Sequence, residues 1–384
     1  MGEAITAPLS GLKVVVHASG VAAAYAARLL GAMGAVVTLL EPPQGCALRR
    51  EPPFVGDGVS ALFAYLAAGW SSTVVELDTG HGQSLLGALL SESEVFIDDT
   101  PVAQRAELGL DPDAIAALHP HLIHVSALPF GASGPKAGWT GEDLVVQHAG
   151  GEGNLLPNGL AVEMFPDRAP LKIGGRFGEM QCGIAAALGA LSALWARPEC
   201  GGQFVDVSGQ DANLAVGAFA IQRLGDGSIE HRVERSFRYG GVIPCADGYL
   251  EMLTLEQRQW DGMVELLGNP EWALDPALAD SLERSRRGPE INRHIRAWAL
   301  VRKVDDIVGA GQKLGVPLAR YKTPAEILVD PQERHRGLFQ PVAIEGAGMI
   351  DMLVSPFHFD GSPLTLGGAV PGVGETRVAI QAET

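Results

Sequence analysis

One stretch near the N-terminus carries residue types that could bind a nucleotide. Ser19-Gly20 follow an apolar segment, a helix is expected over 21–33, and Glu41 comes about 20 residues later, the spacing of a dinucleotide-binding unit. Such a unit uses three glycines to bring its backbone against a pyrophosphate, whereas residues 18–23 contain one. Pro42-Pro43 also crowds the position beside Glu41 where a ribose would bind. We therefore expect neither NAD nor flavin, and interpret the stretch as an ordinary strand–helix–strand unit.

Two further sets of residues have metal-ligating side chains. His119, His121 and His124 lie before and within an expected strand, but no carboxylate at a suitable spacing completes a site. The four cysteines form no C-x-x-C pair, the spacing that structural zinc sites use; they are at positions 46, 182, 200 and 245. We expect no metal, and so few cysteines in a long chain are typical of a reducing compartment.

The elements that would position such residues alternate between strand and helix in the first part of the chain. Apolar, β-branched runs predict strands, and the Ala- and Leu-rich runs between them predict helices. The expected strands cover 12–18, 35–41, 72–77, 94–98 and 122–127. This order is typical of an α/β fold with a mostly parallel sheet and helices on both faces. A longer apolar helix is expected over 179–197, ended by Gly201-Gly202.

The character of the sequence changes from about Gly240 onward. Ala246-Asp247-Gly248 lies between two short apolar runs and predicts a hairpin, and charged amphipathic helices follow as far as Lys313. We therefore predict a small α+β domain over residues 228–318. The remaining residues, 1–227 and 319–384, would form one large α/β domain.

Charge and hydropathy exclude several classes of partner. The 384 residues carry a formal net charge of −17, whereas nucleic acids and anionic membrane surfaces require a positive patch. Residues 21–40 are apolar, but they contain Arg28 and many Ala and Gly residues, so a helix and a buried strand explain them better than a membrane span. Residues 1–10 lack the pattern of a signal peptide. We expect a cytoplasmic protein that binds neither nucleic acid nor membrane.

Short motifs distributed over nearly the whole chain carry a family resemblance. They include Pro8-Leu9-Ser10-Gly11-Leu12-Lys13-Val14, Leu108-Gly109-Leu110-Asp111, Phe130-Gly131-Ala132-Ser133-Gly134-Pro135, Glu142-Asp143-Leu144, Cys245-Ala246-Asp247-Gly248-Tyr249, Gly315-Val316-Pro317 and Pro356-Phe357-His358-Phe359. In this order they resemble the family III CoA-transferases, the CaiB/BaiF family. That family includes formyl-CoA transferase and carnitine CoA-transferase, and α-methylacyl-CoA racemase is related to it.

The resemblance implies both an architecture and a reaction. It implies a large Rossmann-like domain built from both ends of the chain, a small domain from the middle, and an interlocked dimer, either a homodimer or a heterodimer with a family III paralogue. It also implies that coenzyme A is a co-substrate, moved from an acyl-CoA to a small carboxylic acid. In this chemistry an enzyme carboxylate attacks the donor thioester and then carries the CoA.

The resemblance points to Glu179 as the catalytic carboxylate. The family has an Asp at the start of the long apolar helix, shortly after Pro-x-Arg/Lys-x-Gly, and this chain has Pro170-Leu171-Lys172-Ile173-Gly174 followed by Glu179. The alternative is an acid that only caps the helix, because helix N-termini favour negative charge. Glu142 is the second expected catalytic acid, able to orient or protonate a bound carboxylic acid. The alternative for Glu142 is a loop acid bonded to its own backbone.

The expected CoA contacts come from several loops. By resemblance, Ala22, Gly69 and Asp99 lie at or near CoA-contacting positions, and Gly240-Gly241 matches a mobile glycine-rich loop over the intermediate. Several basic residues of the family are absent here, and charge-assisted phosphate contacts contribute about 1.5–3 kcal/mol each. Arg105 and the adjacent pair Arg49 and Arg50 could compensate for these missing phosphate contacts from new positions.

These substitutions leave three functions open. The first is an active CoA-transferase with Glu179 as nucleophile and Glu142 assisting. The second is a partner subunit that no longer binds CoA and completes a heterodimer with an active paralogue. The third is a CoA-thioester isomerase or lyase on the same scaffold, because a fold does not fix its chemistry. A glutamate at position 142, where the related racemases have His, counts against racemase activity.

Overall fold

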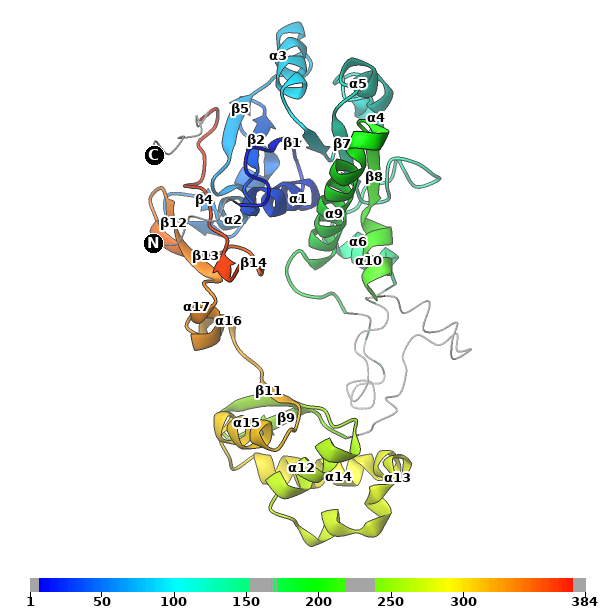
Figure 1. The fold of residues 1–384 in the computed structure, drawn as a ribbon, viewed down its shortest axis with the longest axis vertical. Helices are drawn as coiled ribbons and strands as arrows, with labels where there is room; N and C mark the ends of the chain where they lie inside the picture. Colours follow the sequence, from blue (N-terminus) through cyan, green and yellow to red (C-terminus); the bar gives the residue numbers. More distant parts are fainter. Residues whose placement is uncertain are drawn as a thin grey trace. The chain divides into compact units, whose positions relative to one another are not determined.

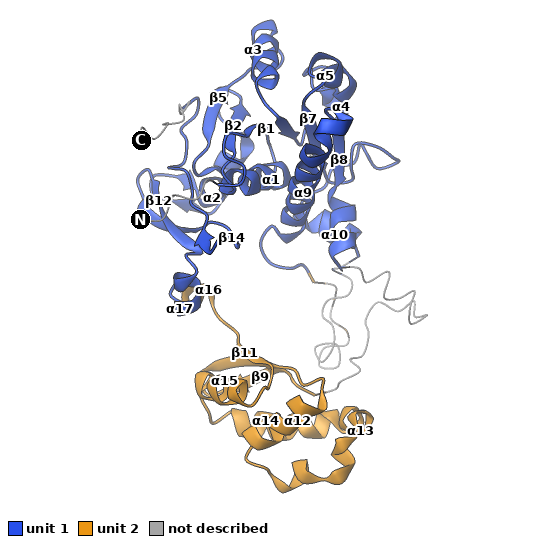
Figure 2. Ribbon diagram, viewed as in Figure 1, with its two compact units in different colours: residues 1–153, 172–227, 328–384 blue, residues 154–171, 228–327 orange. Residues whose placement is uncertain are grey.

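The computed structural model describes residues 7–151, 153, 167, 169, 171–217 and 239–375 (Figure 1). The chain divides into two compact units (Figure 2): unit 1 comprises residues 1–153, 172–227 and 328–384, and unit 2 comprises 154–171 and 228–327. The functional domain limits that we drew from the sequence stay a prediction.

Unit 1 is built on a six-stranded sheet in which every neighbouring pair is parallel. Its order is β5-β2-β1-β6-β7-β8. The strands are β1 (Lys13–His17), β2 (Val36–Glu41), β5 (Ser71–Val74), β6 (Val95–Asp98), β7 (Ile123–Leu128) and β8 (Phe204–Ser208). β6 and β7 are buried along their whole length. β6 begins as an apolar run, whereas β7 has buried His124 and Ser126 between its apolar residues. The predicted α/β fold with a mostly parallel sheet is confirmed.

Alternate residues of the strands face two separate cores. Val14 and Val16 pack with α1 (Val21–Ala32) and α9 (Phe177–Cys200), whereas Val15 packs on the other face. That second face is covered by α3 (Gly80–Ser91) and α5 (Pro112–Leu118). Helices therefore lie on both faces of the sheet, as Figure 1 shows.

The Ala-rich helices α1 and α9 pack closely against each other. A Cβ atom at Gly183 would lie 2.7 Å from the carbonyl oxygen of Ala22, so only glycine permits this approach. Small residues on both helices allow their backbones to come near, and the first turns of both helices border the same pocket. α9 ends at Gly201, which has a φ of 72°. In the part of the chain that the structure describes, α9 alone has the length and apolar composition to cross a membrane, a test that core helices also pass.

The remaining elements of unit 1 are short. They are α2 (Ala61–Ala67), α4 (Val102–Arg105), α6 (Asp143–Ala149), α10 (Gly209–Gly217), α17 (Pro331–His335), η1 (Ala47–Arg50), β3 (Phe54–Val55), β4 (Val59–Ser60), β12 (Phe339–Ile344), β13 (Gly348–Leu353), β14 (His358–Phe359) and β15 (Ser362–Pro363). The C-terminal segment is tied to the first helix, because buried Arg28 donates to the carbonyl of Leu353 at 2.7 Å. α10 covers the start of a helix that the sequence predicts over 210–224, and residues 218–224 lie outside the described residues.

Unit 2 has a three-stranded antiparallel sheet with helices against it. Its strands are β9 (Gly241–Cys245), β10 (Gly248–Met252) and β11 (Leu318–Arg320), in the order β11-β10-β9. Its helices are α12 (Gln257–Leu266), α13 (Ser281–Arg286), α14 (Gly288–Ala299) and α15 (Val304–Lys313), with the 3-10 turns η2 (Glu271–Leu274) and η3 (Pro276–Ala279). α16 (Pro324–Leu328) follows at the end of the unit. Ile291, Ile295 and Ala299 form one buried face of α14, as the sequence pattern predicted.

Candidate functional site

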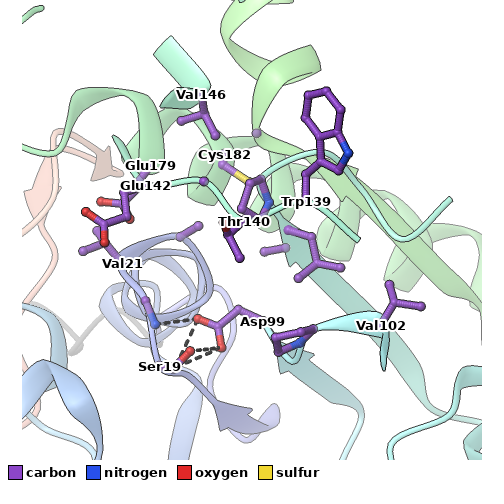
Figure 3. A pocket seen from close by; sticks show the side chains of 18 of the residues that line it. Ser19, Val21, Asp99, Val102, Trp139, Thr140, Glu142, Val146, Glu179 and Cys182 are labelled. Carbon is purple, nitrogen blue, oxygen red and sulfur yellow. Dashed lines mark hydrogen bonds between the residues drawn. The ribbon is translucent and has the colours of Figure 1, made fainter. Parts of the chain in front are cut away.

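A pocket of about 320 Å³ lies at the carboxyl ends of the central strands of unit 1 (Figure 3). The chain builds outward from β1 to β2 and β5, then returns to place β6 on the other side of β1. At such a switch point the loops diverge and leave a crevice, where ligands of open α/β sheets bind. Ser19 after β1, Asp99 after β6 and Pro129 after β7 line this pocket.

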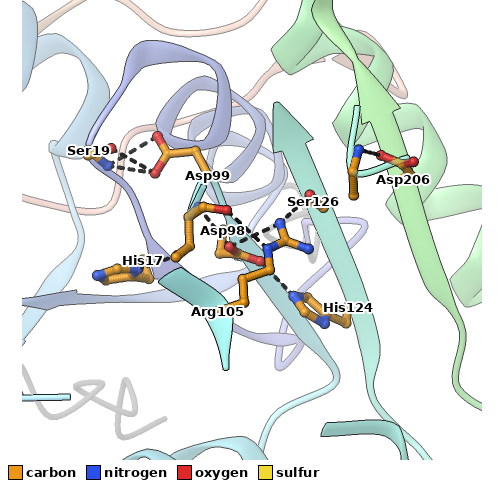
Figure 4. A network of polar contacts seen from close by, with 10 residues as sticks. His17, Ser19, Asp98, Asp99, Arg105, His124, Ser126 and Asp206 are labelled. Atoms are coloured by element: carbon orange, nitrogen blue, oxygen red, sulfur yellow. Dashed lines mark hydrogen bonds and ion pairs between the residues drawn. The ribbon is translucent and has the colours of Figure 1, made fainter. Parts of the chain in front are cut away.

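The N-terminus of α1 is closed by a carboxylate from the neighbouring strand. Asp99 accepts hydrogen bonds from the backbone N–H of Ser19 at 2.9 Å and of Gly20 at 2.6 Å, and from the Ser19 hydroxyl at 3.0 Å (Figures 3 and 4). Burial raises the pKa of Asp99, while the two N–H donors act to lower it. In dinucleotide-binding proteins such amides receive a phosphate. Here they are occupied by a side chain of the protein itself.

The N-terminus of α9 is capped by a different acid. Asp143, at the start of α6, accepts a hydrogen bond from the backbone N–H of Glu179 at 3.1 Å and pairs with the Lys172 ammonium at 2.6 Å. Asp143 is only 2% exposed, so this capping group is fixed in the interior. Because Asp143 performs the capping, the carboxyl group of Glu179 is left to face the pocket.

Glu179 lies in a setting that makes its ionisation responsive near neutral pH. Burial raises the pKa of Glu179 to about 7; nearby Arg176 lowers it, and the charges of Asp143, Glu142 and Glu51 raise it. Arg176 Nη1 lies 3.4 Å from Glu179 Oε2, and Arg176 Nη2 lies 2.7 Å from Glu51 Oε2. A carboxyl group with such a pKa is ionised in a substantial fraction of molecules at neutral pH, and it is nucleophilic in that form.

Glu142 and Glu179 lie on the same side of the pocket, as Figure 3 shows. Glu142 is the N-cap residue of α6, although we expected a loop, and its side chain makes no capping hydrogen bond to that helix. The catalytic role of Glu142 and its alternative both stay predictions. Cys182 also lines the pocket, but burial, with the charges of Glu179 and Asp99, raises the pKa of its thiol to about 12. Cys182 is thus protonated at neutral pH, and a protonated thiol is a poor nucleophile.

Arg105 is part of a buried polar network beneath the pocket (Figure 4). It is 3% exposed and contacts Asp98 at 3.4 Å, Ser126 Oγ at 2.5 Å and the Thr100 carbonyl at 3.0 Å. His124 Nε2 lies 2.6 Å from the other carboxylate oxygen of Asp98. In the described ranges, no group of three or more His, Cys, Asp or Glu side chains could hold a metal ion.

The expected CoA-contacting residues divide by position. Ala22 and Asp99 line the pocket, whereas Gly69 and Arg105 do not. Gly69 has a φ of 84° and its N–H donates to the Ala369 carbonyl, and the following indole, Trp70, is buried in the core. Gly240 and Gly241 belong to unit 2, where the Gly240 N–H donates to Asn292 Oδ1 at 2.8 Å. Any CoA contacts of Gly69, Arg105, Gly240 and Gly241 stay a prediction.

The other expected basic compensators have partners within the protein. Arg49 pairs with Glu41 at 2.6 Å and donates to the Pro371 carbonyl. Arg50 is exposed and donates to the carbonyls of Gln44 and Gly45. Among the described residues that line the pocket, Arg176 is the one cationic side chain.

The fold agrees with comparisons to known proteins. A solved structure of a CAIB/BAIF family protein from Brucella suis matches with a TM-score of 0.83 and 29% identity, covering 96% of this chain and 97% of that one. The family model described as CoA-transferase family III matches residues 9–377. The chain therefore belongs to CoA-transferase family III, which confirms the resemblance that the motifs carry.

Two relatives of established description show the breadth of the family. The succinate–glutarate CoA-transferase of Agrobacterium fabrum is 28% identical, covering 98% of this chain and 95% of its own. A subunit of the succinyl-CoA:(R)-benzylsuccinate CoA-transferase of Thauera aromatica is also 28% identical, covering 94% of this chain and 90% of its own.

Sequence reasoning missed two pocket residues that shape the electrostatics of Glu179. Arg176 precedes Glu179 by three residues, and this i,i+3 spacing at a helix start is a signal that could have identified it. Glu51 is 125 residues from Arg176 in sequence, and no local pattern connects the two.

Proposed function

We propose that this protein is a CoA-transferase that moves CoA from an acyl-CoA to a small carboxylic acid, with Glu179 as nucleophile and Glu142 assisting. The observation that carries the proposal is that two acids at the start of α9 have different positions. Asp143 caps the helix, while Glu179 presents its carboxyl group to the pocket with a pKa raised to about 7.

The reaction then runs through Glu179 without net proton transfer. A Glu179 carboxylate oxygen attacks the acyl carbon of the donor thioester. The C–S bond of the thioester breaks, CoA departs as a thiolate, and Glu179 is joined to the acyl group in a mixed anhydride. The thiolate attacks the Glu179 carbonyl carbon, so that the donor acid departs as a carboxylate and Glu179 becomes a CoA thioester. The acceptor carboxylate attacks that thioester and the two steps run in reverse order, which restores the Glu179 carboxylate.

We place the reacting end of CoA in the pocket, beside Ala22 and Asp99. A pantetheine arm is neutral, and the lining near Val102, Trp139 and Val146 is largely apolar, which suits it. The phosphates would lie outside the part of the pocket that Glu179 occupies. Nothing in this proposal requires a metal, NAD or flavin.

The experiment is an exchange assay with the full-length protein. Acetyl-, succinyl- and glutaryl-CoA are each mixed with isotopically labelled monocarboxylic and dicarboxylic acids, and label in the CoA ester is measured. We expect transfer for at least one pair of substrates. Its double-reciprocal plots should be parallel lines, the ping-pong pattern of a covalent intermediate. No transfer with any pair, together with undetectable CoA binding at millimolar CoA, would remove the proposal.

The second candidate is a subunit that completes an active partner. The charge of the pocket favours it, because the described lining contains the acids Glu51, Asp99, Glu142 and Glu179 against the single cation Arg176. A relative that is named as a subunit also supports it. If the purified chain binds no CoA but restores transfer to a family III paralogue, this candidate replaces the first.

A second chain in either arrangement has a suitable surface on α9. Three large apolar side chains of this helix are exposed: Ile184 to 45%, Leu188 to 63% and Trp195 to 90%. Exposed apolar groups of this kind often mark a surface that another protein covers. We propose that a partner chain, a second copy or a paralogue, covers them. The four cysteines are free thiols, which supports a cytoplasmic location.

A further inference from the structure

The pocket carries an excess of acidic side chains, although the proposed reaction must bring negatively charged substrates into it. Four carboxyl groups and one guanidinium line it among the described residues, and both substrates bring negative charge. A free carboxylate that enters beside Glu179 and Glu142 is repelled unless a cation meets it. In the part of the chain that the structure describes, Arg176 is the cation that contacts Glu179.

Arg176 is held more firmly on one side than on the other. Its Nη2 makes a 2.7 Å contact with Glu51 Oε2, whereas its Nη1 lies 3.4 Å from Glu179 Oε2, a long and weak contact. Glu51 therefore fixes the guanidinium, and the face toward Glu179 can exchange its partner. A planar guanidinium suits this role because it can bind two oxygens of one carboxylate.

Charge conservation in the proposed reaction links Arg176 to the substrate. When Glu179 becomes a thioester it loses its negative charge, and the same charge appears on the departing donor carboxylate. The acceptor carboxylate must later approach the neutral thioester from the same side. The pocket therefore holds one exchangeable negative charge, which is on Glu179 or on the free acid but not on both.

We propose that Arg176 binds the substrate carboxylate, and that it changes partner from Glu179 to the free acid when Glu179 is converted to the covalent intermediate. This inference rests on the proposed function and assigns Arg176 as the residue that selects a carboxylate acceptor. Glu51 is the positioning residue that keeps Arg176 in place.

The first test separates the two substrates kinetically. With the acyl-CoA and acid pair that the wild type exchanges, R176M should raise the KM for the acid about 10- to 100-fold, the loss of one charge-assisted carboxylate contact. The KM for the acyl-CoA should change much less, and R176K should recover part of the loss. R258M removes an exposed arginine of α12 and serves as the matched control. Equal changes in both KM values, or no change for the acid, would overturn the assignment.

The second test does not depend on turnover. Glu179→Gln imitates the uncharged state of the intermediate, so at pH 8 it should bind the free acid at least about tenfold more tightly than the wild type, by calorimetry. This gain should disappear when E179Q is measured in the R176M background. A gain of equal size with and without Arg176 would mean that relief of repulsion alone explains it, and would contradict the inference.

The proposed function and the role of Arg176 can be contradicted separately. A wild type that forms no Glu179–CoA thioester contradicts the proposed function. A wild type that forms it, with an acid KM that ignores R176M, contradicts only the role of Arg176.

Discussion

Two helix N-termini meet at the pocket, and they use their acidic residues differently. At α1, Asp99 accepts hydrogen bonds from two backbone N–H groups, so its carboxylate is committed to the helix end. At α9, Asp143 takes the capping role through the backbone N–H of Glu179, and Glu179 itself remains available. The comparison teaches that an acid at a helix start is a candidate for chemistry when another group already satisfies the helix.

The largest expected effect comes from removing the available carboxylate at the start of α9. Glu179→Gln should reduce CoA transfer by about 10³-fold or more, because an amide cannot replace the attacking carboxylate. Asp99→Asn should still form the enzyme-bound thioester, since it alters the other helix end. The measurement is the initial rate of exchange. Glu92→Gln, at an exposed acid paired with Lys13, is the matched control and should keep the wild-type rate.

The pH dependence of stability should reveal the raised pKa of Glu179. The folded pKa of Glu179 is raised to about 7 from 4.5, so the folded state holds this proton more tightly than the unfolded state. Stability from this group is therefore present below pH 4.5 and is lost as the pH rises through about 7. Relative to wild type, Glu179→Gln should gain up to about 3 kcal/mol in the free energy of unfolding at pH 8, and little at pH 4.5.

Urea unfolding of both proteins at the two pH values measures this difference. A constant difference between pH 4.5 and pH 8 would contradict the raised pKa. Activity of the wild type should rise over the same range, because only the ionised carboxyl group attacks.

Removing the cap of α9 should affect both stability and activity. Asp143→Ala leaves the Glu179 N–H without its acceptor and the Lys172 ammonium without its partner, which should cost about 2 kcal/mol of unfolding free energy. Activity should also fall, because the start of α9 positions Glu179. Thermal unfolding and exchange rates measure the two effects. A loss of stability with full activity would show that Glu179 does not depend on Asp143.

A smaller effect is expected from separating the two helices. Gly183→Ala would place a Cβ atom 2.7 Å from the Ala22 carbonyl oxygen, and overpacking of this kind costs about 1–3 kcal/mol. Gly87→Ala in α3 meets no atom within 4 Å and should gain up to about 1 kcal/mol from helix propensity. Chemical unfolding of both variants gives the comparison. Two stabilised variants would contradict the close packing of α1 and α9.

The sheet and the long helix could be predicted because their signals are local. β6 and β7 contain apolar and β-branched residues within short segments, and the Ala-rich sequence of α9 ends at a glycine. α6 was missed because seven residues that include Gln147 and His148 show too little apolar periodicity.

The candidate site was less accessible to sequence reasoning. Glu179 was found through the family pattern, but its partners come from distant segments: Glu51 reaches it through Arg176, and Asp143 caps its backbone. Arg105 was expected to contact CoA phosphates in place of basic residues that the family has and this chain lacks. In the fold it lies inside, because Asp98 and Ser126 from adjacent strands accept its guanidinium.

The most direct test of the account is a covalent one. Wild-type protein is incubated with an acyl-CoA that it turns over, treated with hydroxylamine, and digested, and the peptide that contains Glu179 is examined by mass spectrometry. If Glu179 is the nucleophile, we expect a hydroxamate on Glu179 that forms only when the acyl-CoA is present. An active enzyme whose Glu179 stays unmodified while another side chain carries the label would contradict it.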